Sequence, residues 1–357
     1  MIYQLLRPLI FKFDAESAHN LAINFLKYLP RFATIMTLDK DYDNLKSRVF
    51  DLDFKSPIGM AAGFDKNCEV VQVLEKFGFG FIEAGTTTPK PQIGNERPRI
   101  FRLVQDQAII NRLGFNNLGS EAFLKNLQLI KSNATKIIGV NIGKNKDTSD
   151  ANSDYLALMS KFYEIADYLT INISSPNTKN LRDLQNEQQL TNLLQALDNL
   201  KVELKEKTQK NTPILLKIAP DLDFDQQQQI ADIVVNSQIS GVIISNTTIE
   251  RSQNLKSNYA KEQGGLSGKP LFEKSNEVLR NFYKLTQGKI PLIGVGGISN
   301  ADDVYQKMRS GASLVQIYSA FIYQGFGLVE KIKKDLSLLI AKEGFKNIEE
   351  IVGIDSK

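Results

Sequence analysis

The chain of 357 residues is poor in the side chains that most often carry metal and proton chemistry, with one cysteine, Cys68, and one histidine, His19. A single cysteine cannot form an internal disulfide, which fits a reducing compartment, and we expect Cys68 to pack as a small buried hydrophobe. The usual zinc site and the HExxH metalloprotease motif need more Cys or His ligands than the chain has. A Ser-His-Asp triad is disfavoured because it would have to recruit His19. Proton transfer must therefore use Asp, Glu, Lys, Tyr or a less common base.

Long apolar runs and a strong net charge are lacking too. No stretch approaches the roughly 18 apolar residues of a membrane-spanning helix, and the apolar run at 8–11 is too short for the core of a signal peptide. The 44 basic and 40 acidic side chains give a formal charge of +4, which is too weak at this length to indicate a nucleic-acid partner. We therefore expect no secretion, no transmembrane anchor, no nucleic acid and no metal.

What is present, from about residue 50 onward, is an alternation of short apolar runs with segments of helical period. The runs are continuous, as in strands that are covered on both faces. Eight strands are predicted, at 56–63, 80–87, 136–142, 168–174, 213–218, 241–245, 291–296 and 313–318. Helices are predicted between them, at 69–77, 120–131, 154–166, 186–207, 225–237, 275–287 and 301–310, the last with Asn300 as its cap and Gly311 at its end. Eight such units predict an α/β fold of the (β/α)8 TIM barrel type, and an open doubly wound sheet remains the alternative.

The first forty residues break this pattern and predict two amphipathic helices. Apolar residues of the first fall near one face, and Asp14 is placed to cap the second, whose apolar residues recur every three or four positions until Pro30. The apolar residues are Leu5, Leu6, Leu9, Ile10 and Phe13, then Ala18, Leu21, Ala22, Phe25, Leu26 and Leu29, with Arg7, Lys12, Lys27 and Arg31 beside them. Two interpretations stay open, namely a hairpin that packs on the barrel and one whose apolar side meets a membrane surface.

Amides, hydroxyls and two lysines follow the predicted strands, at the mouth where barrel active sites lie. The polar stretches are 61–66, 85–88, 140–143, 171–178, Lys217 and 245–248, and a further segment at 111–117 follows the second strand. Such a mouth suits a planar, polar, partly anionic ligand that needs many directional hydrogen bonds. No close pair of acids stands at matching strand ends, so hydrolysis by paired carboxylates is disfavoured.

A phosphate site is indicated at the last two units. The glycines at 294–297 lead directly into a helix after the seventh predicted strand, and 316–319 closes the eighth. Barrels often bind phosphate at this place, through backbone N–H groups and a helix N-terminus. A second glycine-rich loop is expected at 264–268.

Together these segments resemble the class 2 dihydroorotate dehydrogenases, which are quinone-linked, FMN-containing enzymes of pyrimidine synthesis. The resemblance runs from the N-terminal hairpin to about residue 335 and leaves 336–357 without an assigned role. It is carried by 61–66, 111–117, 245–248, 264–268, 294–297 and above all by Asn-Ile-Ser-Ser-Pro-Asn-Thr at 172–178. Class 1 relatives place a cysteine where Ser175 stands, and Cys68 lies elsewhere in the chain.

The resemblance implies an FMN-dependent oxidoreductase, a flavoprotein that converts (S)-dihydroorotate to orotate. It implies that Ser175 takes the proton, N5 of FMN takes the hydride, and Thr178 and Phe115 surround the proton relay. A hydroxyl can act as a base only when it is desolvated, held close to the carbon and able to pass its proton on. A mobile loop at 176–189 would close over the substrate and exclude water.

Ligand contacts follow from the same resemblance, residue by residue. Amides suit an imide edge, a lysine suits a carboxylate, and a lysine beside the flavin would stabilise charge that arrives with the hydride. The implied substrate contacts are Lys66, Asn111, Arg112, Leu113, Gly114, Phe115, Asn172, Asn177, Asn246 and Thr247. The implied FMN contacts are Ala62, Gly63, Phe64, Asp65, Lys66, Thr86, Asn141, Asn172, Lys217, Ser245, Gly268, Gly297, Tyr318 and Ser319.

The electrons must then leave the flavin, and the resemblance implies a membrane quinone as their acceptor. His19 and Arg102 match quinone-site positions, with His19 the one whose role depends on the resemblance alone. The chain then divides into a quinone-funnel hairpin at 1–40 and a catalytic barrel at 41–357. We expect peripheral association with the cytoplasmic face of the cell membrane, the inner membrane.

Three alternatives remain beside this interpretation. Another flavin barrel could reduce a nucleobase or isomerise an isoprenoid, but the Ser175 motif and the hairpin speak against it. A soluble, fumarate-linked dihydroorotate dehydrogenase is disfavoured by serine in place of cysteine. A membrane-peripheral binding protein without catalysis is disfavoured by the intact set of Asn, Lys and Ser positions, and a purified protein without a flavin spectrum would revive it.

Overall fold

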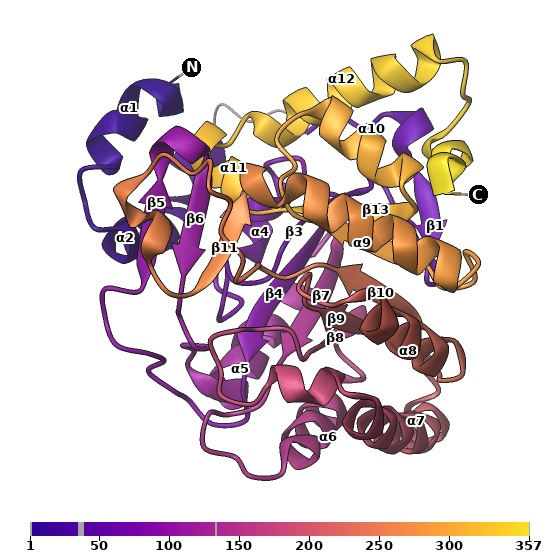
Figure 1. Cartoon of the computed structure of the whole chain (residues 1–357). Coiled ribbons are helices and arrows are strands. Elements are labelled where there is room, and N and C mark those ends of the chain that lie inside the picture. Colours follow the sequence, from indigo (N-terminus) through magenta and orange to yellow (C-terminus); the bar gives the residue numbers. More distant parts are fainter. Residues whose placement is uncertain (1, 35–38, 133, 357) are drawn as a thin grey trace.

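The centre of the molecule is a closed barrel of eight parallel strands, in a computed structural model that describes residues 2–34, 39–132 and 134–356. Each barrel strand pairs with the next one along the chain, and the last returns to the first with Val315 opposite Ile58. The predicted barrel is therefore confirmed and the open sheet is excluded (Figure 1). The strands are β3 (Ile58–Met60), β4 (Phe81–Thr87), β7 (Ile137–Ile142), β8 (Tyr168–Asn172), β9 (Ile214–Ile218), β10 (Gly241–Ile244), β12 (Leu292–Val295) and β13 (Ala312–Ile317).

Helices cover the outside of the barrel, and all seven that the sequence predicted between strands are present. Their apolar stripes face the strands, as in α7, which buries Leu190, Leu193 and Leu197. The predicted cap of α10 is confirmed, because the Asn300 side chain accepts the N–H of Asp303 at 2.9 Å. The helices are α4 (Val71–Glu75), α5 (Gly119–Lys131), α6 (Ala151–Phe162), α7 (Glu187–Thr208), α8 (Phe224–Val235), α9 (Phe272–Leu285), α10 (Ala301–Arg309), α11 (Ser319–Gln324) and α12 (Leu328–Lys342).

A short hairpin that the sequence did not predict closes the floor of the barrel. Its strands, β1 (Ser47–Val49) and β2 (Leu52–Phe54), pair antiparallel. Val49 and Phe54 pack against apolar side chains near the beginnings of the barrel strands. The rings of Phe54 and Phe81 meet edge to face, with their centroids 5.3 Å apart. The floor is therefore sealed by apolar contacts, which leaves polar chemistry to the opposite end.

A three-stranded antiparallel sheet stands at that opposite end, in the order β11 (Gly265–Gly268), β6 (Ala108–Asn111), β5 (Ile100–Leu103). The expectation of a glycine-rich loop at 264–268 was wrong, because most of this stretch is strand β11. The glycines serve close packing rather than a turn, since a Cβ at Gly265 would collide with the Thr247 side chain. The sheet lies between the N-terminal helices and the barrel (Figure 1).

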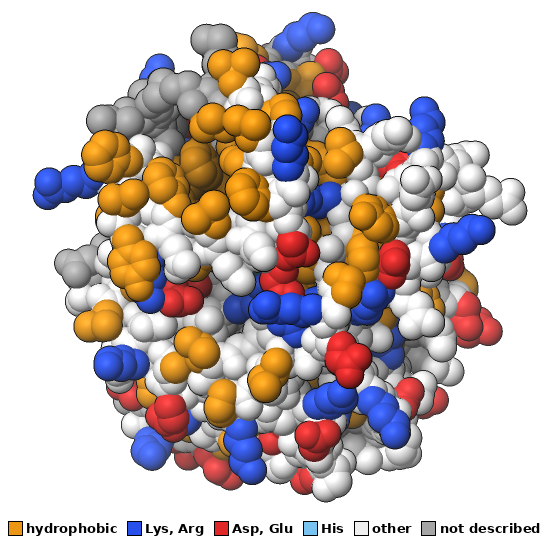
Figure 2. All heavy atoms as spheres, turned by 90° about the vertical axis from the view of Figure 1, so that its left-hand side faces the viewer, with side chains coloured by type: hydrophobic (Ala, Val, Ile, Leu, Met, Phe, Trp, Pro, Cys, Tyr) orange, Lys and Arg blue, Asp and Glu red, His pale blue; other side chains and the backbone are white. Residues whose placement is uncertain are grey.

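The N-terminal segment forms α1 (Ile2–Ile10), α2 (Ala15–Tyr28) and the short α3 (Pro30–Thr34). Asp14 caps α2 as predicted, and its carboxylate accepts the N–H of Ser17 at 2.8 Å. Apolar side chains of this segment are nonetheless exposed, and Figure 2 shows apolar side chains gathered around a hollow in the upper part of this side of the molecule, with Lys and Arg beside them. The exposed ones are Leu5, Leu6, Leu9, Phe13, Leu21, Phe25, Tyr28, Leu29 and Phe32, which we call the apolar face.

Polar contacts hold this segment to the barrel. Tyr3 donates to the carbonyl of Ile322, and Arg7 donates to the carbonyl of Tyr323 at 3.0 Å. The boundary expected at residue 40 is a prediction that these contacts do not test, and residues 1 and 35–38 of the hairpin lie outside the described residues. Within the described ranges, no helix is both long and apolar enough to cross a membrane.

Candidate active site

Alternate residues of the barrel strands point inward and form two layers. The lower layer is apolar and includes Phe81, Tyr168, Leu215 and Leu314. Two positions further along, each of these four strands carries a polar side chain that points inward, and β7 contributes a fifth. These five side chains form a polar layer between the sealed floor and the mouth. This layer consists of Glu83, Asn141, Thr170, Lys217 and Gln316, all of them buried.

Glu83 is the only acid of the polar layer, and sequence reasoning missed it. Its carboxylate accepts from Asn141 Nδ2 at 2.7 Å, Gln316 Nε2 at 2.8 Å, and the hydroxyls of Tyr168 and Thr170 at 3.1 Å each. A charged group that is fully buried must be satisfied in this way, because burial without partners is costly. The signal in the sequence was an acid inside an otherwise apolar strand, two residues after an inward-facing phenylalanine.

Lys217 faces the same carboxylate, with Nζ 3.8 Å from Glu83 Oε1. Burial lowers the pKa of Lys217, and the charge of Glu83 opposes that shift. Burial, with Glu83 beside the hydroxyl, raises the pKa of Tyr168 well above its usual value. Lys217 is therefore a desolvated lysine paired with a carboxylate at the centre of the barrel, a position that suits stabilisation of negative charge on a group bound at the mouth.

Amides and hydroxyls continue from the polar layer to the mouth as one hydrogen-bonded series, the asparagine chain. Asn172 Nδ2 donates to Asn141 Oδ1 at 3.0 Å, and the Ser174 hydroxyl donates to Asn172 Oδ1 at 2.7 Å. Asn246 Nδ2 then donates to the Ser174 hydroxyl at 2.8 Å, and Asn246 Oδ1 accepts the N–H of Thr247 at 2.7 Å. The structure thus brings together Asn141, Asn172, Asn246 and Thr247, as well as Thr86, whose hydroxyl donates to Asn141 Oδ1 at 2.6 Å.

Ser175 lies in the loop that follows β8 and is 6% exposed. Its hydroxyl accepts the N–H of Asn177 at 3.3 Å. The Thr178 hydroxyl is buried and has no hydrogen-bond partner among the described residues. Phe115 adopts φ of +53°, which is unusual for a residue other than glycine, and its ring lies against Gly143. Two buried hydroxyls with unused bonding capacity therefore stand near the mouth.

The segment 111–114 is held to this loop by its neighbours. Asn177 Nδ2 donates to the Asn111 carbonyl at 3.1 Å. Asn95, which sequence reasoning also missed, donates from Nδ2 to the carbonyls of Arg112 and Asn177 at 3.0 and 3.1 Å, and its own N–H donates to the carbonyl of Leu113. The Arg112 guanidinium pairs with Glu262 at 2.7 Å. Arg112 is thus engaged away from the asparagine chain.

The stretch 62–66 joins the mouth to the hairpin. The Asp65 carboxylate accepts the N–H groups of Glu69 and Val70 at 2.8 Å each, so it is used in local structure, and burial raises its pKa to about 6. The Lys66 side chain extends toward α2, where its Nζ lies 3.3 Å from His19 Nε2. Burial lowers the pKa of Lys66 to about 8.

His19 lies on α2 itself, and Arg102 lies on β5 beside the link between α1 and α2. The His19 ring meets Phe64 edge to face at 5.5 Å, and burial, with Lys66 nearby, holds the pKa of His19 well below its usual value, so the imidazole is neutral. The Arg102 guanidinium lies 4.5 Å from the ring centroid of Phe11 and donates to the carbonyls of Phe11 and Phe13.

A buried ion pair ties α2 to the same region. Glu16 is 5% exposed and accepts from Arg99 Nε at 2.9 Å and from Arg97 at 3.0 Å. Burial alone would raise the pKa of Glu16, but the two guanidinium groups lower it overall. Arg99 also donates to the carbonyl of Asn95 at 2.7 Å, which links α2 through Asn95 to Asn177.

The glycine loop after β12 fits a phosphate. In the described part of the chain, the backbone N–H groups of Gly296 and Gly297 donate to no protein acceptor. Ser319, at the start of α11, is 2.9 Å from the Ser267 hydroxyl. Tyr318 lies beside Gly63, with its hydroxyl 3.4 Å from that carbonyl, and burial raises the pKa of Tyr318 to about 12. Gly268 on β11 has φ of +95°, and Ser245 follows β10 and is buried.

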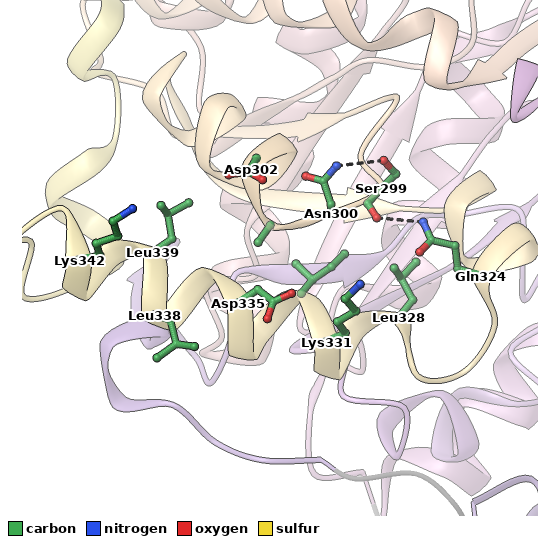
Figure 3. A pocket seen from close by; sticks show the side chains of 12 residues that line it. Ser299, Asn300, Asp302, Gln324, Leu328, Lys331, Asp335, Leu338, Leu339 and Lys342 are labelled. Carbon is green, nitrogen blue, oxygen red and sulfur yellow. Dashed lines mark hydrogen bonds between the residues drawn. The ribbon is translucent and has the colours of Figure 1, made fainter. Parts of the chain in front are cut away.

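A separate cavity of about 480 Å³ lies between the start of α10 and α12. Its side chains include Ser299, Asn300, Lys331, Asp335 and Leu338 (Figure 3). Gln324 spans one end, where Nε2 donates to the Ser299 carbonyl at 2.9 Å. None of the residues of the asparagine chain lines this cavity.

The comparisons with known proteins bear on this arrangement. A family model described as dihydroorotate dehydrogenase matches residues 44–340. Proteins named dihydroorotate dehydrogenase (quinone) from Rhodopseudomonas palustris (strain BisA53) and Rhizobium rhizogenes (strain K84 / ATCC BAA-868) are 46% and 48% identical to the chain; the alignments cover 98% and 96% of this chain and 94% and 93% of those proteins. The crystal structure of DHODH in complex with ferulenol from Eimeria tenella superimposes with a TM-score of 0.91 at 37% identity, and the match covers 96% of each chain.

Proposed function

The chain belongs to the dihydroorotate dehydrogenase family, and from this premise we propose that Ser175 is the base with which it oxidises dihydroorotate, with FMN as the hydride acceptor. The chain is an oxidoreductase that converts dihydroorotate to orotate in pyrimidine synthesis and passes the electrons to a quinone. The observation that carries the role of Ser175 is its burial at the mouth beside the asparagine chain. A hydroxyl in that place is desolvated, which a serine base requires.

The chemistry divides between the protein and the cofactor. Bound FMN would supply an acceptor for the hydride that leaves the ring CH of dihydroorotate. Ser175 Oγ takes the proton from the ring CH2 while its own proton passes onward. The Thr178 hydroxyl, which is buried and has no hydrogen-bond partner among the described residues, is our candidate to receive that proton. Phe115 and Gly143 keep water from that side of the relay.

The residues around the mouth divide the binding. Asn172, Asn246 and Thr247 meet the imide edge of the substrate, and Lys66 meets its carboxylate. Asn111 and Asn177 close the ring from the other side. Lys217 stabilises negative charge on the flavin, and Gly297, Gly268 and Ser319 hold its phosphate. The remaining flavin contacts are those named from the sequence, save that the Asp65 carboxylate is already engaged by backbone N–H groups.

The proposal extends to the membrane. The apolar face, with Arg7, Lys12, Lys27 and Arg31 around it, suits a bilayer surface with anionic lipids. A lipid-soluble quinone would enter beneath α1 and α2, where His19 and Arg102 lie. We propose that the association is peripheral and on the cytoplasmic face of the inner membrane.

Ser175→Ala tests the assignment of the base. We expect the variant to bind FMN and orotate as the parent does, but to reduce its flavin at least about 100-fold more slowly when dihydroorotate is added without oxygen, because general-base catalysis is lost. The flavin absorbance is followed by stopped flow. Exposed Ser252→Ala is the control and should react at the parent's rate. Flavin reduction by Ser175→Ala at the parent's rate would reject Ser175 as the base.

A further inference from the structure

The asparagine chain has a direction. From Thr247 inward, every group donates its hydrogen bond to the next, and the series ends at Glu83. Asn246 and Thr247 are half-buried at the mouth, whereas Ser174, Asn172, Asn141 and Glu83 are all buried, at 0%, 3%, 0% and 0% exposed. No part of Glu83 reaches the mouth.

The direction follows from groups at both ends. The backbone N–H groups of Ser174 and Thr247 can only donate, so they hold the oxygens of Asn172 and Asn246, at 3.2 and 2.7 Å. Asn172 must therefore present Nδ2 inward, and it needs an acceptor there. An ionised carboxylate can only accept, so Asn141 must present Nδ2 to Glu83, which leaves its oxygen as the acceptor for Asn172.

We propose that Glu83 is a positioning residue that keeps the oxygen of Asn141 toward Asn172, and so keeps the Asn172 amide in its place at the substrate. The inference rests on the proposed function, since it concerns the amides assigned there to the imide edge of dihydroorotate. Each amide presents donors or an acceptor to that edge according to its orientation. Reversing one would set donor against donor, and an unpaired buried polar group weakens binding more than a missing contact does.

A charge effect alone predicts the opposite outcome. Orotate is an anion, and Glu83 is an anion inside the barrel below it. Removing the charge of Glu83 would leave Lys217 uncompensated, which would strengthen the binding of an anion. Weaker binding after neutralisation therefore points to orientation rather than charge.

Glu83→Gln is the first test. Glutamine keeps the size of the side chain but can donate as well as accept, so the orientation of Asn141 is no longer dictated. We expect the dissociation constant of orotate, measured by titration of the flavin spectrum, to rise roughly tenfold. Glu75 is the matched control, because it is 3% exposed and accepts from Thr135 and Lys136 on the outside of the barrel. Glu75→Gln should bind orotate within about twofold of the parent.

The double variant Glu83→Gln/Asn141→Asp tests the mechanism. Aspartate at 141 is again acceptor-only, so Asn172 must present Nδ2 as before, and the glutamine introduced at position 83 can donate to the new carboxylate. We expect orotate affinity to return to within about threefold of the parent, since the direction from Asn172 outward is restored. A role of Glu83 in packing alone would not be repaired by a second substitution.

The outcomes separate the two levels of the argument. A parent protein that binds neither orotate nor dihydroorotate would overturn the proposed function. A parent that binds orotate, together with Glu83→Gln at equal or higher affinity, would overturn the role of Glu83 alone. Should Glu83→Gln fail to fold, Asn141→Ala removes the amide that links Glu83 to Asn172. Unchanged orotate affinity in Asn141→Ala would then reject the proposal, and a roughly tenfold loss would support it.

Discussion

At the scale of the residue, the site depends on charges that burial has made sensitive to pH. Lys66 is the clearest case, because burial lowers its pKa to about 8 and its Nζ lies 3.3 Å from His19 Nε2. His19 is neutral over the whole neutral and alkaline range, since its pKa is held well below the usual value. Asp65 has a pKa of about 6, so it has already lost its proton in that pH range. Of these three groups, Lys66 is therefore the one whose charge changes between pH 7 and 9.5.

We expect orotate binding to weaken as the pH rises through about 8, because Lys66 is protonated and positive below that value and neutral above it. The dissociation constant, measured by flavin-spectrum titration between pH 7 and 9.5, should rise toward the alkaline end. Lys66→Met should bind weakly throughout and lose this dependence. An alkaline limb that persists in Lys66→Met would assign it to another group.

Lys307 carries a second pH dependence, in stability. It is fully buried on α10, donates to Ser275 and Asn276 at 2.7 and 2.8 Å, and burial lowers its pKa to about 7. The unfolded lysine keeps its proton up to about 10.5, so between pH 7 and that value the unfolded chain binds more protons and the folded state gains stability as the pH rises.

Lys307→Met should therefore lack a rise of up to about 1.4 kcal/mol per pH unit that the parent shows between pH 7 and 9. Urea unfolding at pH 7, 8 and 9 gives the free energies of unfolding, and the difference between the two proteins cancels groups that they share. Exposed Lys289→Met is the control. Equal slopes for the parent and Lys307→Met would mean that the folded protein keeps this lysine charged.

The residues of the site were open to prediction where a motif names them. The strand ends indicated Asn141, Asn172 and Asn246, which the structure brings into one hydrogen-bonded series, and also Lys217. The motif at 172–178 indicated Ser175, whose role stays a prediction. Glu83, Asn95 and Arg99 were not predicted from the sequence. These residues hold other groups in place, and no local sequence pattern indicates a residue whose partners lie far along the chain. The partners of Glu83 come from four other strands.

At the scale of the element, the barrel strands and helices were predictable because each is defined by its own periodicity. The sheet formed by β5, β6 and β11 was not, since its strands have four residues each and exist only through pairing. The glycines at 264–268 led to the wrong prediction of a loop, whereas they allow close packing within strand β11. The loop at 176–189 is a mixed case, because Arg182 ties it to the carbonyls of Ser174 and Thr247 at 3.0 Å each. Asn177 is held as well, by hydrogen bonds with Asn111 and Asn95 at 3.1 Å each, so the closure of the loop at 176–189 stays a prediction.

The apolar face gives a prediction at this scale. Leu5 and Leu9 on α1 are 77% and 57% exposed. Leu5→Asp/Leu9→Asp should reduce binding to phosphatidylglycerol vesicles by at least about tenfold, because two leucines no longer enter the bilayer and two anions face its surface. Cosedimentation measures the binding. Flavin reduction by dihydroorotate should not change, whereas reduction of a long-chain quinone should slow.

The matched control is Leu338→Asp, a leucine of α12 that is 62% exposed and lies outside the apolar face. It should bind vesicles as the parent does. Equal vesicle binding by the α1 variant and the parent would mean that α1 does not meet the membrane.

At the scale of the whole molecule, two half-reactions meet in one barrel. The loop after β8 and the segment 111–114 surround the substrate side, and α1 and α2 cover the side proposed for the quinone. The buried pair of Glu16 and Arg99 connects these two sides through Asn95. The hairpin is therefore built into the same hydrogen-bonded structure as the substrate loop.

The sealed floor has a consequence for solvent. Because Phe54 and Phe81 pack across the lower end, we expect water to exchange with the polar layer through the mouth. A ligand bound at the mouth should then block that exchange. Backbone amides of β4 and β9 below the polar layer should then exchange deuterium more slowly when a ligand is bound at the mouth, and the interior becomes dry when the reaction needs it to be.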